Sequence, residues 1–424
     1  MDFKEHLIES IGEKEAELLI ASLSRPSEHA VLLNIEKISD EEFLKEFPQV
    51  KPHPYVKHAY IYDKSVYELG KHIYHELGFY YLQEPSAMVV SSLIDFQDDD
   101  YVLDMCAAPG GKAIQASFKM HGNGLIIAND LSFDRCGLLS NNVERLGLGN
   151  IIITNGNMTD TYQKPINAFD KIILDAPCSG SGMFRKHELM ESEWSINKVK
   201  RFQAIQKDLI LIAYKMLKPG GLLSYSTCSY SKEEDEDVIS YLLDKTDAVI
   251  EEIKDIDAAY INPNCPIGIR LMPSHFQGEG QYICHIRKPG ESKKNEYDHV
   301  NKFKDIIPFD YDVKKVNDYL FAIKNGKEIK GFNIYRYGIK VGEYKKDRFA
   351  YDLHYARSLS PEQFPSVDLS LEETKDYLFG NQINKSSNKK GFILLTYKNK
   401  AIDIAKTDGK VIKNYYPKGL RKKF

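Results

Sequence analysis

The spacing of hydrophobic and polar positions changes along the chain and divides it into regions. In the first 85 residues, apolar positions lie three and four apart, as in HLIESIG and EAELLIASL, so residues 1–85 are expected to form a mostly helical region. The segment ISDEEFLKEF has an acidic first turn behind Ser39 or Asp40, which is typical of a helix with an N-cap.

From Tyr101 onward, short β-rich runs alternate with stretches of helical period. The runs are YVLDM, GLIIAND, NIIITN, FDKIILDAP and LLSYSTCS. Strands that alternate with helices predict a parallel sheet covered on both faces, so residues 86–290 are expected to form an α/β domain. Two last runs, GIRLMPS and GQYICHIRK, flank a turn that contains glycine and predict a closing antiparallel hairpin.

The remaining residues predict two smaller units. Residues 288–302 are polar and rich in turn-forming residues, which is typical of a linker. Residues 303–366 contain GFNIYRYGIKVGEYKK, a predicted strand pair, and residues 372–424 contain KKGFILLTYKNKAIDIAK, a predicted hairpin.

Composition narrows the class of protein. The chain has 424 residues, 42% of them hydrophobic and 28% charged, which is typical of a soluble globular protein of several domains. No segment resembles a secretory signal or approaches the roughly 20 apolar residues of a membrane span, so a cytoplasmic protein without a membrane partner is expected. The six cysteines form no CxxC pair, and we expect no metal site.

A glycine-rich turn follows the first strand of the α/β region and predicts a cofactor site. The turn presents backbone N–H groups and a helix N-terminus, with the helix starting near Lys112, and Asp130 ends the next strand, where its carboxylate can accept both hydroxyls of a ribose. The sequence AAPGGK is neither the GxGxxG of a dinucleotide site nor a P-loop, because Ala113 follows Lys112. A carboxylate beside the turn suits the cationic methionine end of S-adenosylmethionine.

Two cysteines lie on polar loops after later strands. Cys178 follows Asp175 behind the strand KIIL, and Cys228 follows the strand LLSY. Ligands of open α/β sheets bind at the carboxyl ends of the strands, so both thiols are expected beside the cofactor turn, where N–H groups and cations can lower a thiol pKa. The other cysteines at 136, 265 and 284 are expected to be buried as small apolar residues.

Paired thiols at such a site indicate methylation of a pyrimidine. Carbon 5 of cytosine is a weak nucleophile until a thiolate adds to carbon 6 and converts the ring into an enamine. An acid such as Asp175 can assist at ring nitrogen 3, and a second cysteine can assist release of the product.

Three segments together resemble a known family. DMCAAPGGK from Asp104 to Lys112, DAPCSGSG from Asp175 to Gly182, and STCS from Ser226 to Ser229 resemble the signature loops of the Sun/nucleolar-protein family of RNA cytosine-5 methyltransferases. The resemblance implies a Rossmann-like S-adenosylmethionine-dependent methyltransferase fold. The catalytic residues that it implies are Cys228 as nucleophile, Cys178 for product release and Asp175. The cofactor-binding residues that it implies are Cys106, Ala107, Ala108, Pro109, Gly110, Gly111, Lys112, Asp130, Arg135, Asn157 and Asp175.

The segments LGFYYLQEPSAM and RLMPSHFQGEGQYICHIRK and the tail DYLFG…KGFILLT…KNYYPKGLR are similar to the bacterial RsmF type. This resemblance implies 16S ribosomal RNA as partner, an RNA-binding N-terminal region at 1–85 and a C-terminal PUA-like RNA-binding domain at 372–424. Residues 398–424 hold nine lysines and arginines and two aspartates, interleaved with Tyr415 and Tyr416, which could bind phosphates and stack on bases. Met183 to Lys186 could guide RNA, or Phe184 could pack. Two positions depart from the family: Asn157 replaces an aspartate near the adenine, and Leu32 replaces an arginine.

Three alternatives remain open. A transfer RNA cytosine-5 methyltransferase would share the same loops. A non-catalytic RNA-binding protein of the same fold would not need both cysteines. An N-methyltransferase would carry an Asn/Asp-Pro-Pro-Tyr loop in place of the sequence DAPC. The sequence predicts no oligomeric state.

Overall fold

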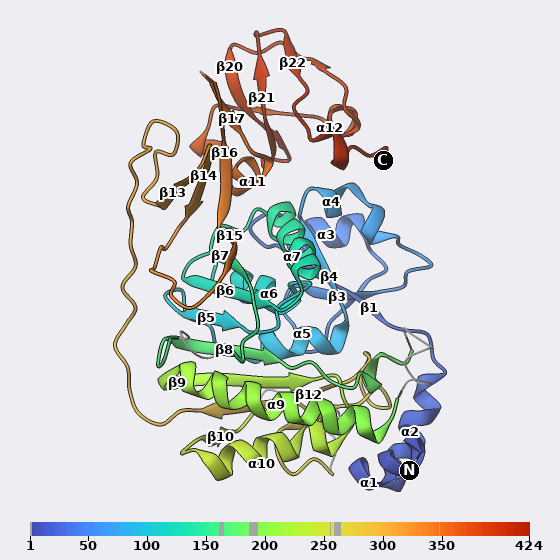
Figure 1. The fold of residues 1–424 in the computed structure, drawn as a ribbon. Helices are drawn as coiled ribbons and strands as arrows, with labels where there is room; N and C mark the ends of the chain where they lie inside the picture. Colours follow the sequence, from blue (N-terminus) through green and yellow to red (C-terminus); the bar gives the residue numbers. More distant parts are fainter. Residues whose placement is uncertain (1, 161–164, 186–193, 255, 258–263, 347) are drawn as a thin grey trace.

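A computed structural model of the chain describes residues 2–160, 165–185, 194–254, 256–257, 264–346 and 348–424. Its centre is a nine-stranded sheet of order β10-β12-β9-β8-β5-β6-β7-β15, with β11 paired to β12 (Figure 1). The parallel strands are β5 (Tyr101–Asp104), β6 (Leu125–Asp130), β7 (Ile151–Asn155), β8 (Phe169–Asp175) and β9 (Leu217–Thr227). The antiparallel strands are β10 (Val249–Glu251), β11 (Ile269–Leu271), β12 (Gln281–Arg287) and β15 (Ile334–Tyr337). The predicted α/β class and the predicted closing hairpin are confirmed.

Helices cover both faces of this sheet, because alternate strand residues point to opposite sides. Val102 and Ile126 belong to the apolar core that includes residues of α6 and α7, whereas Leu103 and Ile127 belong to the core that includes residues of α9 and α10. The covering helices are α5 (Pro85–Ser92), α6 (Gly111–Lys119), α7 (Phe133–Leu146), α9 (Ile196–Met216) and α10 (Glu236–Lys245).

The order of the parallel strands reverses between β5 and β8. From β5 the chain runs through β6 to β7 in one direction, and then returns to β8 and β9 on the other side. At such a reversal the loops diverge and leave a crevice at the carboxyl ends of the strands, which is where open α/β sheets bind ligands.

The N-terminal region contains a sheet as well as helices, so its prediction as mostly helical is wrong in part. The order β2-β3-β1-β4 forms an antiparallel sheet. Strand β1 is buried along nearly its whole length and β3 along all of it, so neither shows the alternation from which a strand can be read. The helix capped by Ser39 is confirmed. The elements are α1 (Phe3–Ile11), α2 (Glu13–Leu23), β1 (His29–Leu33), α3 (Asp40–Glu46), β2 (Lys51–Pro52), β3 (Ala59–Tyr62), η1 (Leu69–Lys71), α4 (Ile73–Glu76) and β4 (Tyr80–Gln83).

Two smaller sheets follow the catalytic region. The first has the order β13-β14-β16-β17 and the second β18-β20-β21-β22-β19. Their elements are β13 (Asp312–Val316), β14 (Tyr319–Ile323), β16 (Ile339–Lys345), β17 (Arg348–Tyr351), α11 (Leu353–Ser358), η6 (Pro361–Gln363), β18 (Ser366–Asp368), α12 (Leu371–Phe379), β19 (Ile383–Asn384), β20 (Gly391–Tyr397), β21 (Lys400–Thr407), β22 (Val411–Lys413) and η7 (Lys418–Leu420). The predicted hairpin is confirmed as β20 and β21.

The strands predicted within residues 331–346 do not pair with each other. Strand β15 pairs with β7 and extends the central sheet, while β16 pairs with β14 and β17. Between them Gly338 has φ +53° and lies so close to Ala322 that a Cβ there would be 2.4 Å from the Ala322 carbonyl oxygen. A glycine at this position turns the chain out of one sheet and into the next.

The N-terminal and C-terminal regions share one apolar core. Tyr74 belongs to the same cluster as Tyr377 and Tyr416, and Arg357 contacts the Glu76 carboxylate at 3.5 Å. The C-terminal sheets therefore lie above the catalytic region and against the N-terminal region (Figure 1). In the part of the chain that the structure describes, no helix is long and apolar enough to cross a membrane.

Candidate active site

A cavity of about 350 Å³ lies at the carboxyl ends of β5, β8 and β9. It brings together the glycine-rich turn, the loop after β8 and the loop after β9, as the sequence predicts for loops at one sheet edge. Its lining comprises Tyr81, Leu82, Gln83, Glu84, Ala87, Cys106, Ala107, Ala108, Pro109, Gly111, Lys112, Asp175, Met183, Cys228, Glu279, Gly280 and Gln281. The residues from β4 and β12 in this lining, Gln83 and Gln281 among them, were not predicted, because only folding brings these distant segments to the cavity.

The glycine-rich turn depends on close backbone packing. Gly110 is the N-cap of α6 and has φ +117°, and a Cβ there would lie 2.7 Å from a methyl carbon of Leu139. A Cβ on Gly111 would lie 2.6 Å from the amide nitrogen of Gln83. The two glycines therefore let the turn pack between α7 and β4, with the N-terminus of α6 at the cavity.

Asp104, at the end of β5, is a buried carboxylate beneath this turn. Neither of its oxygens makes a well-formed hydrogen bond within the described chain. Burial raises its pKa to about 7, with Asp175 and Asp130 adding to the effect and Lys112 opposing it. A buried carboxylate of this kind is stabilised by a cationic group placed beside it. Asp104 is part of the motif DMCAAPGGK, but it was not among the predicted site residues.

Asp130 holds the turn from the neighbouring strand. Its carboxylate accepts the backbone N–H of Ala108 at 3.1 Å and that of Ser132 at 2.9 Å, and it lies 3.4 Å from the Arg135 guanidinium. Asn157 is exposed, and its side-chain oxygen accepts the backbone N–H of Thr159 at 3.1 Å. Asp130, Arg135 and Asn157 are not part of the cavity lining.

The two loop cysteines meet. The sulfur atoms of Cys178 and Cys228 are 3.2 Å apart, and of the two only Cys228 lines the cavity. Gly182 makes this approach possible, because its N–H donates to the Cys228 carbonyl at 2.7 Å and a Cβ there would lie 2.3 Å from the same oxygen. Cys178 therefore lies behind the sulfur that faces the cavity.

The expectation of a lowered thiol pKa is wrong for Cys178. The hydrogen bond with Cys228 raises the pKa of the Cys178 thiol well above its ordinary value, and burial and the nearby Glu234 raise it further. Cys178 is therefore held as a thiol beside the sulfur of Cys228, and its S–H can donate a hydrogen bond to a Cys228 thiolate.

A buried carboxylate that the sequence reasoning missed ties the two cysteine loops together. Glu234, at the end of η4 (Lys232–Glu234), accepts the Ser179 hydroxyl at 2.5 Å and the Ser229 hydroxyl at 2.6 Å. It also accepts the Ser179 N–H at 2.7 Å and the Gln206 amide at 3.1 Å. Because Ser179 follows Cys178 and Ser229 follows Cys228, this carboxylate fixes the spacing of the two sulfur atoms. The acidic run just after the second loop was the signal in the sequence.

Asp175 is held in a fixed orientation at the cavity. Its Oδ2 accepts the Lys112 ammonium at 2.7 Å, and its Oδ1 accepts the Ser226 hydroxyl at 2.7 Å and the Gln281 amide at 3.0 Å. Burial disfavours the Lys112 ammonium, but the charge and hydrogen bond of Asp175 outweigh burial, so the pKa of Lys112 is raised. The cavity thus presents a paired cation and carboxylate near the Cys228 sulfur.

Several other predicted RNA contacts are internal packing instead. Arg185 is buried and pairs with the buried Glu279 carboxylate at 2.7 Å, and Phe184 packs on Phe3. Tyr416 is buried and donates to Glu76, so only Tyr415 of the two C-terminal tyrosines is exposed for stacking. Lys186, part of the same predicted guide segment, lies outside the described residues.

The remaining predicted cysteines and substituted positions lie in the interior or near it. Cys136 and Cys284 are buried, and Cys265 is partly buried. Leu32, which replaces the family arginine, is buried in β1 and therefore cannot contact RNA. Within the described ranges, no three side chains of His, Cys, Asp or Glu are grouped to hold a metal ion.

Comparison with known families finds matches along most of the chain. The family described as 16S rRNA methyltransferase RsmB/F matches residues 91–287. The N-terminal domain of 16S rRNA methyltransferase RsmF matches residues 1–85, and the methyltransferase RsmF PUA domain matches residues 364–422.

Two relatives illustrate the range of the similarity. A ribosomal RNA small subunit methyltransferase F from Vibrio atlanticus (strain LGP32) is 30% identical in an alignment that covers 97% of this chain and 96% of its own length. A tRNA (cytosine(49)-C(5))-methyltransferase from Pyrococcus abyssi (strain GE5 / Orsay) is 36% identical in an alignment that covers 68% of this chain and 100% of its own length.

Solved structures agree on the fold of the central region. A methyltransferase homolog protein from Pyrococcus horikoshii superposes with a TM-score of 0.57 at 29% identity, over 67% of this chain and 93% of its own. NSun6 from Pyrococcus horikoshii with SFG gives a TM-score of 0.62 at 22% identity, over 68% of this chain and 98% of its own. The second likeness supports the fold alone.

Proposed function

Because this chain belongs to the RsmB/F family of S-adenosylmethionine-dependent RNA cytosine-C5 methyltransferases, we propose that it methylates 16S ribosomal RNA through a covalent bond between Cys228 and the target cytosine. The observation that carries the proposal is the Cys228 sulfur at the cavity wall, 3.2 Å from the Cys178 sulfur.

The residues at the turn fit the cofactor. S-adenosylmethionine supplies the methyl group when it is bound. The residues proposed to hold it are those of the turn from Cys106 to Lys112, with Asp104 pairing with its cationic methionine end. Asp130, supported by Arg135, is proposed to bind the ribose, and the exposed amide of Asn157 to accept the adenine amino group. The Asp104 carboxylate supports this assignment, because it is buried without a well-formed hydrogen bond in the described residues, and an ammonium group would add to the attraction of Lys112 and of the Cys106 N–H.

The proposed reaction begins when the target base leaves any stacked helix and enters the cavity. The Cys228 thiolate adds to carbon 6, and the pair of Lys112 and Asp175 delivers a proton to ring nitrogen 3 as that bond forms. The enamine that results makes carbon 5 nucleophilic. Before this addition, the S–H of Cys178 donates a hydrogen bond to the Cys228 thiolate and stabilises its negative charge.

Cys178 is proposed to act again after methyl transfer. Once Cys228 is bonded to carbon, its sulfur is a neutral thioether and a weaker hydrogen-bond acceptor, so the hydrogen bond that is the largest cause of the raised Cys178 pKa is weakened. The Cys178 thiol can then lose its proton to solvent, which is the one net proton that the methylation releases, and as thiolate it takes the proton from carbon 5. The bond from Cys228 to carbon 6 breaks and leaves the Cys228 thiolate, ring nitrogen 3 returns its proton to the pair of Lys112 and Asp175, and the product leaves.

Ribosomal RNA is favoured as substrate by the extent of the similarity. The relatives named for the small ribosomal subunit match nearly the whole chain, including the N-terminal and PUA regions, whereas the transfer RNA enzyme matches 68% of it. The greater identity of the transfer RNA relative makes transfer RNA the second candidate.

Bisulfite sequencing of total RNA tests the proposal. A strain that lacks the gene is expected to lose one or more 5-methylcytosines in 16S ribosomal RNA, and the wild-type gene, but not Cys228→Ala, is expected to restore them. Loss confined to transfer RNA would favour the second candidate, and unchanged RNA in the deletion strain would refute both.

A further inference from the structure

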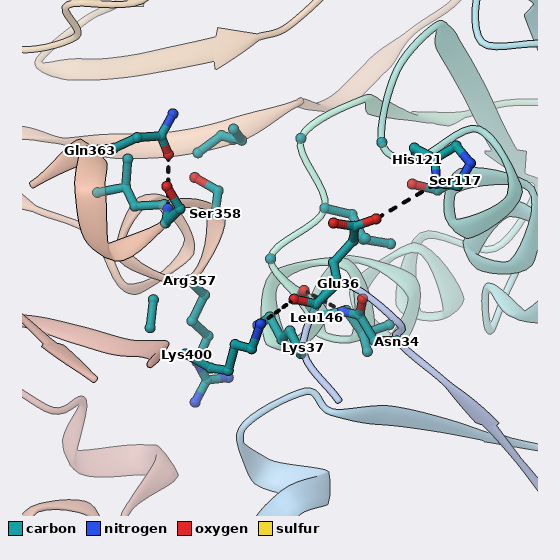
Figure 2. A pocket seen from close by; sticks show the side chains of 18 of the residues that line it. Asn34, Glu36, Lys37, Ser117, His121, Leu146, Arg357, Ser358, Gln363 and Lys400 are labelled. Carbon is teal, nitrogen blue, oxygen red and sulfur yellow. Dashed lines mark hydrogen bonds and ion pairs between the residues drawn. The ribbon is translucent and has the colours of Figure 1, made fainter. Parts of the chain in front are cut away.

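A second cavity, of about 340 Å³, lies where three regions of the chain meet (Figure 2). The N-terminal region contributes Asn34 to Lys37, the catalytic region contributes the ends of α6 and α7, and the C-terminal region contributes residues 357–361 and 399–401. This cavity shares no lining residue with the active-site cavity. The nine residues of α6 separate the two, because α6 begins at the active site and its far end lies ~12 Å away along the helix axis.

Most of the charged side chains in the lining are basic. Lys37, Lys324, Arg357 and Lys400 carry positive charge, and Glu36 is the single carboxylate among the lining residues. Glu36 is 66% exposed and lies 3.6 Å from His121, which is 57% exposed, so the cavity opens to solvent on that side. The walls therefore offer an excess of cations to a solute that enters.

Lys37 differs from the other buried basic residues that the structure describes. Lys112, Lys218, Arg270 and Arg357 are also buried, and each lies within 4 Å of a carboxylate oxygen. Lys37 has no such partner in the described chain and donates one hydrogen bond, to the Leu77 carbonyl at 3.3 Å. A buried ammonium group normally requires a counter-charge, so Lys37 lacks the anion that the other four buried basic residues have.

Two ammonium groups and one guanidinium nitrogen at the cavity are incompletely paired within the described residues. The ammonium groups of Lys324 and Lys400 make no ion pair within the described residues, although Lys400 donates to the Glu36 carbonyl at 2.8 Å. The Nε of Arg357, a side chain in the buried interior, has no hydrogen-bond acceptor there. Burial lowers the pKa of Lys37 well below its ordinary value, and Arg357, Arg145 and Lys400 lower it further, so a bound anion would favour the charged form of Lys37.

We propose that this cavity is a binding site for a phosphate group, held by Lys37, Lys400 and Arg357 with Lys324 at its side. A phosphate offers several acceptor oxygens and a charge that matches three or four converging cations. The volume exceeds that of one phosphate, so the group can belong to a nucleotide of an RNA strand or to a small phosphate-bearing molecule. Because the site joins the N-terminal, catalytic and C-terminal regions, its ligand would also fix their relative positions.

Binding of inorganic phosphate to the full-length protein tests the proposal. Equilibrium dialysis with radiolabelled phosphate at constant ionic strength is expected to find one phosphate per chain. Lys37→Met is expected to bind phosphate at least about tenfold more weakly, because one charge-assisted contact is lost. Lys14→Met, which removes an exposed lysine from α2, is the matched control and is expected to bind as the wild type does.

A stability measurement guards against a folding defect. Without phosphate, Lys37→Met is expected to melt at or above the temperature of the wild type, because it removes a buried amino group that has no carboxylate partner among the described residues. Phosphate is expected to raise the melting temperature of the wild type by about 2 °C and that of Lys37→Met by much less. Should Lys37→Met not fold, Lys400→Met, whose side chain is only half-buried, replaces it in both measurements.

The source of the phosphate follows from competition. Displacement of labelled phosphate by a 16S RNA fragment, with a weaker salt dependence of RNA binding in Lys37→Met, identifies the RNA backbone. Displacement by adenosine monophosphate but not by RNA identifies a small ligand. Absence of phosphate binding to the wild type, or equal binding by the wild type and Lys37→Met, overturns the proposal.

Discussion

Replacement of Asp104 by asparagine is expected to stabilise the protein in the absence of cofactor, but only at neutral and alkaline pH. The Asp104 carboxyl is buried beneath the glycine-rich turn, and its pKa is raised to about 7 from an ordinary value of 3.8. In the unfolded chain the group loses its proton near pH 4, whereas in the folded protein it keeps the proton until about pH 7. Folding therefore takes up a proton in this range, and stability falls as the pH rises from about 4 to about 7.

The size of the effect follows from the same values. A carboxyl pKa raised from 3.8 to about 7 lowers the folding stability at pH 8 by about 4 kcal/mol. The asparagine has no charge to bury, but its amide remains short of hydrogen bonds, at a cost of about 1–3 kcal/mol. The net gain for Asp104→Asn at pH 8 is therefore about 1–3 kcal/mol, and near pH 4 the variant is expected to be no more stable than the wild type.

Thermal melting of the two proteins between pH 4 and pH 9 measures this difference. The melting temperatures are expected to cross as the pH rises, with the variant higher above pH 7. S-adenosylmethionine is expected to raise the melting temperature of the wild type and to have much less effect on the variant, because the proposed partner of its cationic end is gone. A difference between the proteins that does not change with pH would refute the reasoning.

Three further substitutions probe the buried charges. Arg270→Met leaves Asp235 and Glu236 buried without their cation and is expected to destabilise the protein by about 3–5 kcal/mol in urea unfolding. An unchanged unfolding midpoint would mean that groups other than Arg270 stabilise the two carboxylates. Glu234→Ala removes the link between the cysteine loops and is expected to slow single-turnover methylation about tenfold. Glu234→Gln keeps the hydrogen-bonding oxygen and is expected to recover most of the rate. Equal rates in the two variants would contradict a positioning role. Lys112→Gln is expected to lower the same rate about 100-fold with RNA affinity unchanged in filter binding, and a parallel loss of affinity would contradict it.

Much of the catalytic region could be predicted because its information is local in sequence. Each parallel strand is a short apolar run, and each functional loop directly follows one, so the rule that ligands bind at the carboxyl ends of strands was enough to bring Cys178 and Cys228 together. The structure has the two sulfur atoms 3.2 Å apart. The family resemblance added the roles of the residues, which geometry alone does not give.

The missed features depend on contacts between distant residues. Strands β1 and β3 of the N-terminal sheet are five and four residues long and buried almost throughout, so they carry no alternating pattern. Strand β15 lies about 180 residues after its partner β7, and nothing in the sequence of β15 indicates which strand it pairs with. Glu234 looks like one acidic residue of a charged run, and only the folded loops reveal that its carboxylate bonds both Ser179 and Ser229.

The covalent step at Cys228 is tested most directly by incubating Cys178→Ala with S-adenosylmethionine and a 16S RNA substrate, followed by a denaturing gel and peptide mapping. The account predicts a stable protein–RNA adduct that carries a methylated cytosine on Cys228, and no adduct or methylation in Cys228→Ala. Methylation by Cys228→Ala, or an adduct mapped to another residue, would contradict the account.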